Sequence, residues 1–146
     1  MAAPLPQLEL DRQFCFPLYA AARAVTRQYA DLLAAEQLTY PQYLCLLALW
    51  EADAPMTVGE VGARLRLDSG TLTPVLKRLE AAGVVARHRD PDDERRVLVQ
   101  VTEAGWALRE RVADVPMRLV ERAELAPEDA LALRALLDKL LAVLPD

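Results

Sequence analysis

The sequence has little of the chemistry from which metal sites and enzyme active sites are commonly built. It contains one histidine, His88, and two cysteines, Cys15 and Cys45, in 146 residues. A histidine-based metal cage or a conventional catalytic triad is not easily assembled from this set, and two cysteines make neither a disulfide framework nor a metal-ligand cluster. We therefore expect no metal, no cofactor and no enzymatic activity, with both cysteines resting as thiols in a reducing compartment.

Long apolar segments are missing as well. No run reaches the ~18 residues needed to cross a bilayer, and the residues Met1-Ala-Ala-Pro-Leu-Pro6 lack the charged and apolar regions of a signal peptide. These absences predict a cytoplasmic protein without a membrane partner. Aromatic residues make up only 5% of the chain, whereas hydrophobic residues make up 53% and are mostly alanine and leucine, which favours helix. The length suits a single domain, residues 1–146, with its own core.

Positive charge is scarce overall, because 17 Lys and Arg face 22 Asp and Glu and leave a net charge of −5. The distribution is uneven, however. Residues 64–96 hold eight basic and six acidic side chains, a local charge of +2, so the remainder carries −7. A modest basic face on an acidic body permits specific binding of nucleic acid and predicts weak non-specific binding.

Apolar spacing predicts helices in the two flanks of the chain, residues 8–53 and 103–146. The expected helices run from Asp11 to Glu36, from Tyr40 to Trp50, from Thr102 to Val115 with Pro116 as terminator, and from Pro127 to Leu144. Pro17 is awkward in the first of them, so either the regular helix starts near Phe16 or it is kinked there. Terminal helices this apolar need a partner surface, and we expect dimerisation ahead of packing within one chain.

The middle of the chain, residues 54–102, predicts two short helices followed by two strands. Thr57-x-x-Glu60 matches a capping box for the first helix, and Gly83 suits the end of the second, which begins between Asp68 and Thr71. The strands are expected at Val84–Arg89 and Arg95–Val101, joined by Asp90-Pro91-Asp92-Asp93. This order predicts a winged helix-turn-helix, and hence a mainly α fold with a small β wing, which lays the second helix in the major groove of DNA.

The second helix of this motif offers a polar face suited to DNA. Serine and threonine hydroxyls, a glycine that allows close approach, and basic side chains can contact base edges and phosphates. The candidate residues are Asp68, Ser69, Gly70, Thr71, Thr73, Lys77 and Arg78. The alternative interpretation is an ordinary solvated helix face.

The expected wing carries a second set of basic residues. Its arginines, Arg87, Arg89, Arg95 and Arg96, cluster near the turn, where an arginine can enter a narrow minor groove. Asp93 lies two residues before Arg95 and can orient its guanidinium by a charge-assisted hydrogen bond. A solvated charge cluster on a hairpin is again the alternative.

Cys15 is a candidate redox sensor. The first turn of a helix is its expected place, where the positive end of the helix dipole stabilises the thiolate that reacts with peroxides. Tyr19 lies one turn further on, and Phe14 provides part of an apolar surround that favours organic peroxides. The first product would be a sulfenic acid. A small buried side chain is the alternative for Cys15, and it is the expectation for Cys45, which lies in a nearly continuous apolar helix.

The chain resembles the MarR family of dimeric winged-helix regulators in Leu79-Glu80-x-x-Gly83-Val84-Val85, Asp93-Glu94-Arg95 and Val101-Thr102-Glu103-x-Gly105. More narrowly it resembles the organic-hydroperoxide-sensing OhrR branch. The residues that carry this likeness are Phe14-Cys15-Phe16-x-Leu18-Tyr19, Tyr29, Leu38-Thr39-Tyr40-Pro41-Gln42-Tyr43-Leu44, and Leu67-Asp68-Ser69-Gly70-Thr71-Leu72-Thr73-Pro74. The likeness extends over roughly residues 8 to 120.

The resemblance implies a homodimeric repressor that binds an inverted-repeat operator while Cys15 is reduced and leaves it when an organic hydroperoxide oxidises that sulfur. It also implies that Tyr19 and Tyr29 hydrogen-bond the reactive sulfur and that Tyr40 lines the same site. Some members of the branch form an intersubunit disulfide with a later cysteine. This chain has no cysteine after Cys45, which favours capping of the sulfenate by a small cellular thiol.

Two other functions remain open from the sequence. One is a MarR-type repressor released by a small aromatic acid in the dimer cleft, with both cysteines as bystanders. The other is a thiol peroxidase that uses Cys15 catalytically and needs no DNA-binding face.

Overall fold

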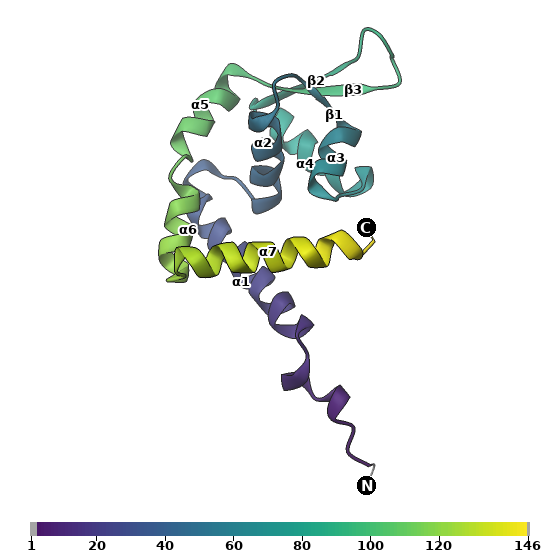
Figure 1. The fold of residues 1–146 in the computed structure, drawn as a ribbon. Coiled ribbons are helices and arrows are strands. Elements are labelled where there is room, and N and C mark those ends of the chain that lie inside the picture. Colours follow the sequence, from purple (N-terminus) through teal and green to yellow (C-terminus); the bar gives the residue numbers. More distant parts are fainter. Residues whose placement is uncertain (1–2, 146) are drawn as a thin grey trace.

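The computed structural model describes residues 3–145, in which a small three-stranded sheet lies at one edge of a mainly helical molecule (Figure 1). The α-helices are α1 (Cys15–Leu32), α2 (Tyr40–Glu51), α3 (Val58–Leu65), α4 (Ser69–Ala81), α5 (Glu103–Arg111), α6 (Val115–Ala123) and α7 (Pro127–Val143). The strands are β1 (Met56–Thr57), β2 (Val85–Arg89) and β3 (Val97–Val101). The mainly α fold with a β wing that the sequence predicts is confirmed.

The three strands and the helices α3 and α4 are here called the winged unit. Its sheet is antiparallel and has the strand order β1-β3-β2. In the β2–β3 hairpin Val85 pairs with Val101 and Arg89 with Val97, close to the predicted strands. The short strand β1 was not predicted. Two residues are too few to show a period, and β1 exists only because Met56 pairs with Val99, far along the chain.

Local capping sets the ends of the helices in this unit. The predicted capping box is present, because the Glu60 carboxylate accepts from the Thr57 N–H at 2.7 Å and Thr57 Oγ1 accepts from the Glu60 N–H at 3.1 Å. Asp68 is the N-cap of α4. Gly83 follows the end of α4 with a φ of 76°, a left-handed conformation that glycine adopts without strain.

The flanking helices differ from prediction in two places. Regular helix does not fill the range Asp11 to Glu36: it runs from Cys15 to Leu32, between short 3-10 turns at Pro6–Leu8, Leu10–Arg12 and Ala34–Glu36. The start at Cys15 agrees with the alternative of a regular helix that begins near Phe16. Pro17 lies in the first turn of α1, where its missing N–H breaks no helical hydrogen bond.

The helix expected from Thr102 to Val115 has the predicted start, with Thr102 as its N-cap, but its expected end is wrong. The helix α5 ends at Arg111, and Pro116 is the second residue of α6 instead of a terminator. Proline is as well suited to starting a helix as to ending one, so its place in the sequence alone does not decide between them.

The buried core lies mainly among α2, α3, α4 and the sheet, and Leu32 of α1, Leu108 of α5 and Val115 of α6 add to it. Elsewhere α1 and α7 keep large apolar side chains at the surface. Leu46, Leu72, Leu76 and Val99 are fully buried, but Leu136 of α7 is 63% exposed. Residues 3–14 extend away from the rest of the molecule (Figure 1). Near its C-terminal end α7 reaches the winged unit, where the Leu141 carbonyl accepts from Arg66 at 2.9 Å. Within residues 3–145, no helix is both long and apolar enough to span a membrane.

Candidate DNA interface and thiol site

The start of α4 is held by hydrogen bonds among the candidate DNA-binding residues themselves. Asp68 accepts from the Thr71 N–H at 2.8 Å and from the Thr71 hydroxyl at 3.1 Å, and these two bonds lower the pKa of the Asp68 carboxyl. The Thr73 hydroxyl donates to the Ser69 carbonyl at 2.7 Å. Asp68 and Thr73 therefore shape the helix end. The exposed candidates whose side chains take no part in these bonds are Ser69, Lys77 and Arg78, and Gly70 is exposed beside them.

The wing presents Arg95 to solvent in the orientation expected from the sequence. Its side chain is 92% exposed, and its Nε donates to Asp93 Oδ1 at 3.1 Å. The backbone N–H of Arg95 donates to the same carboxylate oxygen. The pKa of Asp93 is lowered, first by the side-chain hydrogen bond from Arg95. A carboxylate at the base of an exposed guanidinium fixes its direction without covering it.

Arg87 has a different place from the one expected near the turn. It lies in the middle of β2 opposite Val99, and its side chain is only 21% exposed. Its Nη2 donates to Glu80 Oε1 at 3.1 Å, and its backbone N–H donates to Glu80 Oε2 at 3.0 Å. Arg87 thus ties the wing to the last turn of α4, which sets the angle between the two DNA-facing elements.

Cys15 is the first residue of α1 and is exposed, as expected for a reactive thiol. Its neighbours Phe14, Phe16 and Tyr19 are exposed by 76%, 44% and 62%. The Tyr19 ring lies under the Arg23 guanidinium, 5.5 Å from ring centroid to Cζ. Among the described residues, no hydrogen bond joins Tyr19 to the Cys15 sulfur. The apolar surround is therefore present but open in a single chain.

The other two candidate tyrosines, Tyr29 and Tyr40, meet near the C-terminal end of α1. Tyr29 stacks on Tyr40 of α2 with 4.1 Å between ring centroids and an interplanar angle of 6°. Tyr29 follows Cys15 by 14 residues, which is about 21 Å along a helix axis at ~1.5 Å per residue. One chain therefore does not bring Cys15 together with Tyr29 and Tyr40.

The stack continues into residues that the sequence did not indicate as part of the site. Tyr43 lies 5.6 Å from Tyr29 and 6.4 Å from Trp50, measured between ring centroids. Burial, and then the neighbouring Tyr40 and Tyr43, raise the pKa of Tyr29 to about 12. The Tyr29 phenol therefore stays protonated at neutral pH and can donate a hydrogen bond. Residues that recur every three or four positions along a helix lie on the same face. This spacing along α2 was the signal that could have grouped Tyr40, Tyr43 and Trp50.

Cys45 is fully buried in α2, as expected, and burial raises the pKa of its thiol to about 11. A thiol in this state is a poor nucleophile. The two cysteines therefore differ in access to solvent, and only Cys15 can meet a dissolved peroxide.

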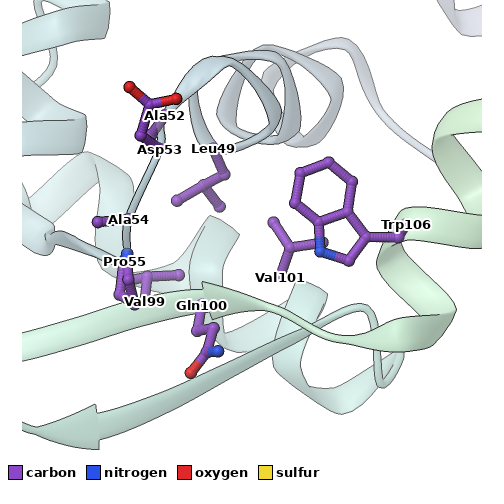
Figure 2. A pocket seen from close by; sticks show the side chains of 9 residues that line it. All are labelled: Leu49, Ala52, Asp53, Ala54, Pro55, Val99, Gln100, Val101 and Trp106. Carbon is purple, nitrogen blue, oxygen red and sulfur yellow. The ribbon is translucent and has the colours of Figure 1, made fainter.

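A small cavity lies between the end of α2, β3 and α5 (Figure 2). It encloses about 140 Å³ and is lined by Leu49, Val101, the exposed Trp106 and the acidic Asp53, among others. Its lining includes no cysteine and no basic residue. An aromatic acid in this cavity would meet a carboxylate of its own sign and no cation. The aromatic-acid alternative concerns the dimer cleft, so it stays open.

The chain matches the family model of the transcriptional regulators SarA/Rot over residues 28–112. It is also 45% identical over 137 residues to the organic hydroperoxide resistance transcriptional regulator of Bacillus subtilis, which covers 94% of this chain and 92% of that protein. The chain belongs to the MarR-type winged-helix family of transcriptional regulators. Like the other members of this family, it is a regulator and not an enzyme.

Two further relatives place the chain within this MarR-type family. The HTH-type transcriptional regulator TtmR of Methylorubrum extorquens is 55% identical over 107 residues, or 73% of this chain, which spans about half the length of TtmR. Reduced AbfR of Staphylococcus epidermidis bound to DNA is 34% identical, with a TM-score of 0.77 over 94% of this chain and 96% of AbfR. Disulfide-formed AbfR, 35% identical over 92% and 94% of the two chains, has a TM-score of 0.62. The conformation of this chain is thus closer to that of AbfR on DNA.

Proposed function

We propose that this protein is a homodimeric repressor that binds an inverted-repeat operator while Cys15 is a thiol and releases it after an organic hydroperoxide oxidises that sulfur. The observation that carries the proposal is the exposed Cys15 at the first turn of α1, within an open apolar surround. The likeness to a regulator of organic hydroperoxide resistance supports it. The proposal places the protein in the cytoplasm, where its DNA and small thiols are found.

The sensing site of this proposal is shared between two copies. Cys15 and Tyr19 lie at one end of α1, and the stacked Tyr29 and Tyr40 lie at the other. Two α1 helices packed antiparallel would bring the first pair of one copy against the second pair of the other. Residues 8–53 and 103–146 would then form the dimerisation and sensing region, and residues 54–102 the DNA-binding region.

The chemistry follows from a thiolate and a protonated phenol. The Cys15 sulfur attacks one peroxide oxygen, an S–O bond forms as the O–O bond breaks, and the departing alkoxide takes up a proton and leaves as an alcohol. The Tyr29 phenol, with its raised pKa, supplies a hydrogen bond to the sulfur or to the peroxide. The sulfenic acid then condenses with a small cellular thiol and releases water, because Cys45 is too deeply buried to act as the second thiol.

Oxidation of Cys15 would weaken DNA binding by changing how the helices of the two copies pack. A bulky adduct on Cys15 cannot remain in a packed junction between two α1 helices, so those helices must shift. The shift changes the distance between the two α4 helices, which must match successive major grooves for both to bind. The exposed residues of α4 and Arg95 of the wing would then no longer reach the DNA together in both copies.

A gel-shift titration on the DNA upstream of the chain's own gene tests the proposal. The reduced protein should retard this DNA, an organic hydroperoxide should abolish the retarded band, and a dithiol reductant should restore it. Release by a small aromatic acid without any oxidant would contradict peroxide sensing and favour the ligand-released alternative. Turnover of excess peroxide and thiol would instead indicate a thiol peroxidase.

A further inference from the structure

A cavity of about 440 Å³ separates the helix α4 from the wing. Its lining combines the first turn of α3 (Val58 and Gly59), Thr73 of α4, and three wing residues, Arg87, Arg95 and Arg96. The ionisable side chains in this lining are all arginines. An anion is therefore the chemistry that the cavity suits.

The position of the cavity identifies the anion. When a winged helix binds DNA, its second helix lies in the major groove and its wing lies beside the adjacent minor groove. One sugar-phosphate strand separates these two grooves, so that strand must pass between the helix and the wing. We propose that this cavity binds a backbone phosphate of the DNA, with Arg96 as its principal cation. The inference rests on the DNA-binding role proposed above and adds residues to it.

The guanidinium N–H groups of Arg96 remain available to a ligand. Its Nη1 lies 3.6 Å from Asp90 Oδ2 and its Nη2 lies 4.0 Å from Glu60 Oε1, both longer than a hydrogen bond. Its side chain is half exposed. Arg87 is mostly buried and donates to Glu80 through Nη2, although its Nε has no partner among the described residues, and Arg95 donates to Asp93 and extends further into solvent. The two nearby carboxylates hold Arg96 at the cavity without using up its N–H groups.

The first turn of α3 adds backbone donors to this side chain. The capping box pairs the N–H groups of Thr57 and Glu60. The N–H groups of Val58 and Gly59, between them, belong to the first turn and have no carbonyl partner in the helix. A Cβ built on Gly59 would meet only Thr57 Oγ1, at 3.9 Å. The missing side chain leaves room for a phosphate to approach these amides.

The surrounding acids argue for a phosphate in DNA over a free anion. Glu60, Glu80, Asp90 and Asp93 each lie within 4.0 Å of one of the three arginines. Four carboxylates beside three guanidiniums leave a local charge of −1, so a small dissolved anion gains little there. A DNA phosphate arrives with many other contacts and releases condensed counterions when it is neutralised.

Three variants test the site on a fluorescent duplex taken from upstream of the chain's own gene, with binding measured by anisotropy over a series of salt concentrations. Arg96→Ala should lower the slope of log K against log salt by about 0.9 for each phosphate that the variant no longer neutralises. Gly59→Asp should weaken binding by placing a negative charge in the cavity, yet an acid in a helix first turn preserves the fold. Arg64→Ala, on α3 but paired with Glu51 outside the cavity, should keep the wild-type slope.

Neutral methylphosphonates, substituted one phosphate at a time, locate the contact. The wild type should lose affinity at a position in each half-site where Arg96→Ala loses none. An unchanged salt slope for Arg96→Ala, or equal losses for both proteins at every position, would overturn the phosphate site while leaving DNA binding intact. Failure of the wild type to bind the duplex at all would instead contradict the proposed function. Inorganic phosphate that competes at millimolar concentration would show a free-anion site and would also overturn the inference.

Discussion

At the scale of single residues, the surroundings of Tyr29 matter most for the proposed chemistry. Its phenol is half-buried and stacked on Tyr40, and burial raises its pKa to about 12, so like an ordinary tyrosine it is protonated at neutral pH. A protonated phenol donates a hydrogen bond to a thiolate or to a peroxide oxygen, whereas phenylalanine of the same shape does not. The ring stack would survive this change, so chemistry and packing can be separated.

Tyr29→Phe should therefore slow the oxidation of Cys15 by at least about tenfold, because a hydrogen bond to a charged group contributes about 1.5–3 kcal/mol. The rate is measured by rapid mixing with an organic hydroperoxide, followed by quenching and trapping of the thiol that remains. Tyr43→Phe, which alters the next ring of the same stack, is the control and should react at the wild-type rate. Equal rates for Tyr29→Phe and the wild type would remove Tyr29 from the sensing site.

The sequence predicted single residues well where their roles are local. The place of Cys15 in the first turn of α1 and the contact between Asp93 and Arg95 follow from neighbours along the chain. The cavity around Arg96 was not predictable in this way. It depends on the β2–β3 register and on how α3 packs beside the wing, which no short segment encodes.

At the scale of elements, Glu80 joins the last turn of α4 to β2 through Arg87. The pKa of Glu80 is lowered, first by the side-chain hydrogen bond from Arg87 and then by the bond from the Arg87 backbone. The folded protein therefore favours the ionised carboxylate more than the unfolded chain does. Its stabilising effect is present above the ordinary pKa range of glutamate and is lost as the pH falls through the lowered folded value.

Glu80→Gln should lower the melting temperature at neutral pH, and the difference from the wild type should close as the pH falls below the ordinary range of glutamate. Thermal unfolding followed by circular dichroism at several pH values measures both. Glu103→Gln, at the start of α5 and outside the Glu80–Arg87 pair, is a control for the loss of one negative charge. A gap that stays constant down to acidic pH would contradict the role of the ionised carboxylate.

The junction between the sheet and α5 is packed around Gly105. A Cβ at this position would collide with the Val84 carbonyl oxygen and would lie 2.7 Å from Val101 Cγ1. Gly105→Ala should therefore destabilise the fold by about 1–3 kcal/mol, as overpacking does, measured as a lower urea midpoint. Gly59→Ala is the matched control, because its Cβ meets nothing closer than 3.9 Å, and alanine favours helix. Similar midpoints for the two variants would contradict this account of the junction.

Elements were predictable from the sequence when one signal marked them unambiguously. The Thr57–Glu60 capping box and Gly83 gave correct helix ends. Pro116 did not, since proline marks either boundary of a helix, and the break between α5 and α6 was missed. The strand β1 was missed because only pairing with β3 makes it a strand.

At the scale of the whole molecule, the apolar sides of α1 and α7 form a cavity of about 710 Å³ lined by Leu18, Leu133, Leu136 and Leu140, among others. This much exposed apolar surface is unusual for a protein that works as a single chain. A second copy is the partner that the proposed function requires.

Leu136→Asp should therefore convert the dimer to a monomer and strongly weaken operator binding, while the helix content stays the same. Analytical ultracentrifugation measures the first, and circular dichroism the last. Arg134→Gln changes the net charge by the same amount on the face of α7 where Arg134 pairs with Asp138, and it should remain a dimer. A Leu136→Asp protein that is still dimeric would place the interface elsewhere.

The central claim is that oxidation of one sulfur decides whether the DNA is held. Its most direct measurement is the fraction of labelled operator released by an organic hydroperoxide from three proteins: the wild type, Cys15→Ser and Cys45→Ser. We predict that the wild type and Cys45→Ser release the DNA over the same range of peroxide concentrations, and that Cys15→Ser stays bound throughout. Release of Cys15→Ser at the same concentrations as the wild type would contradict the account.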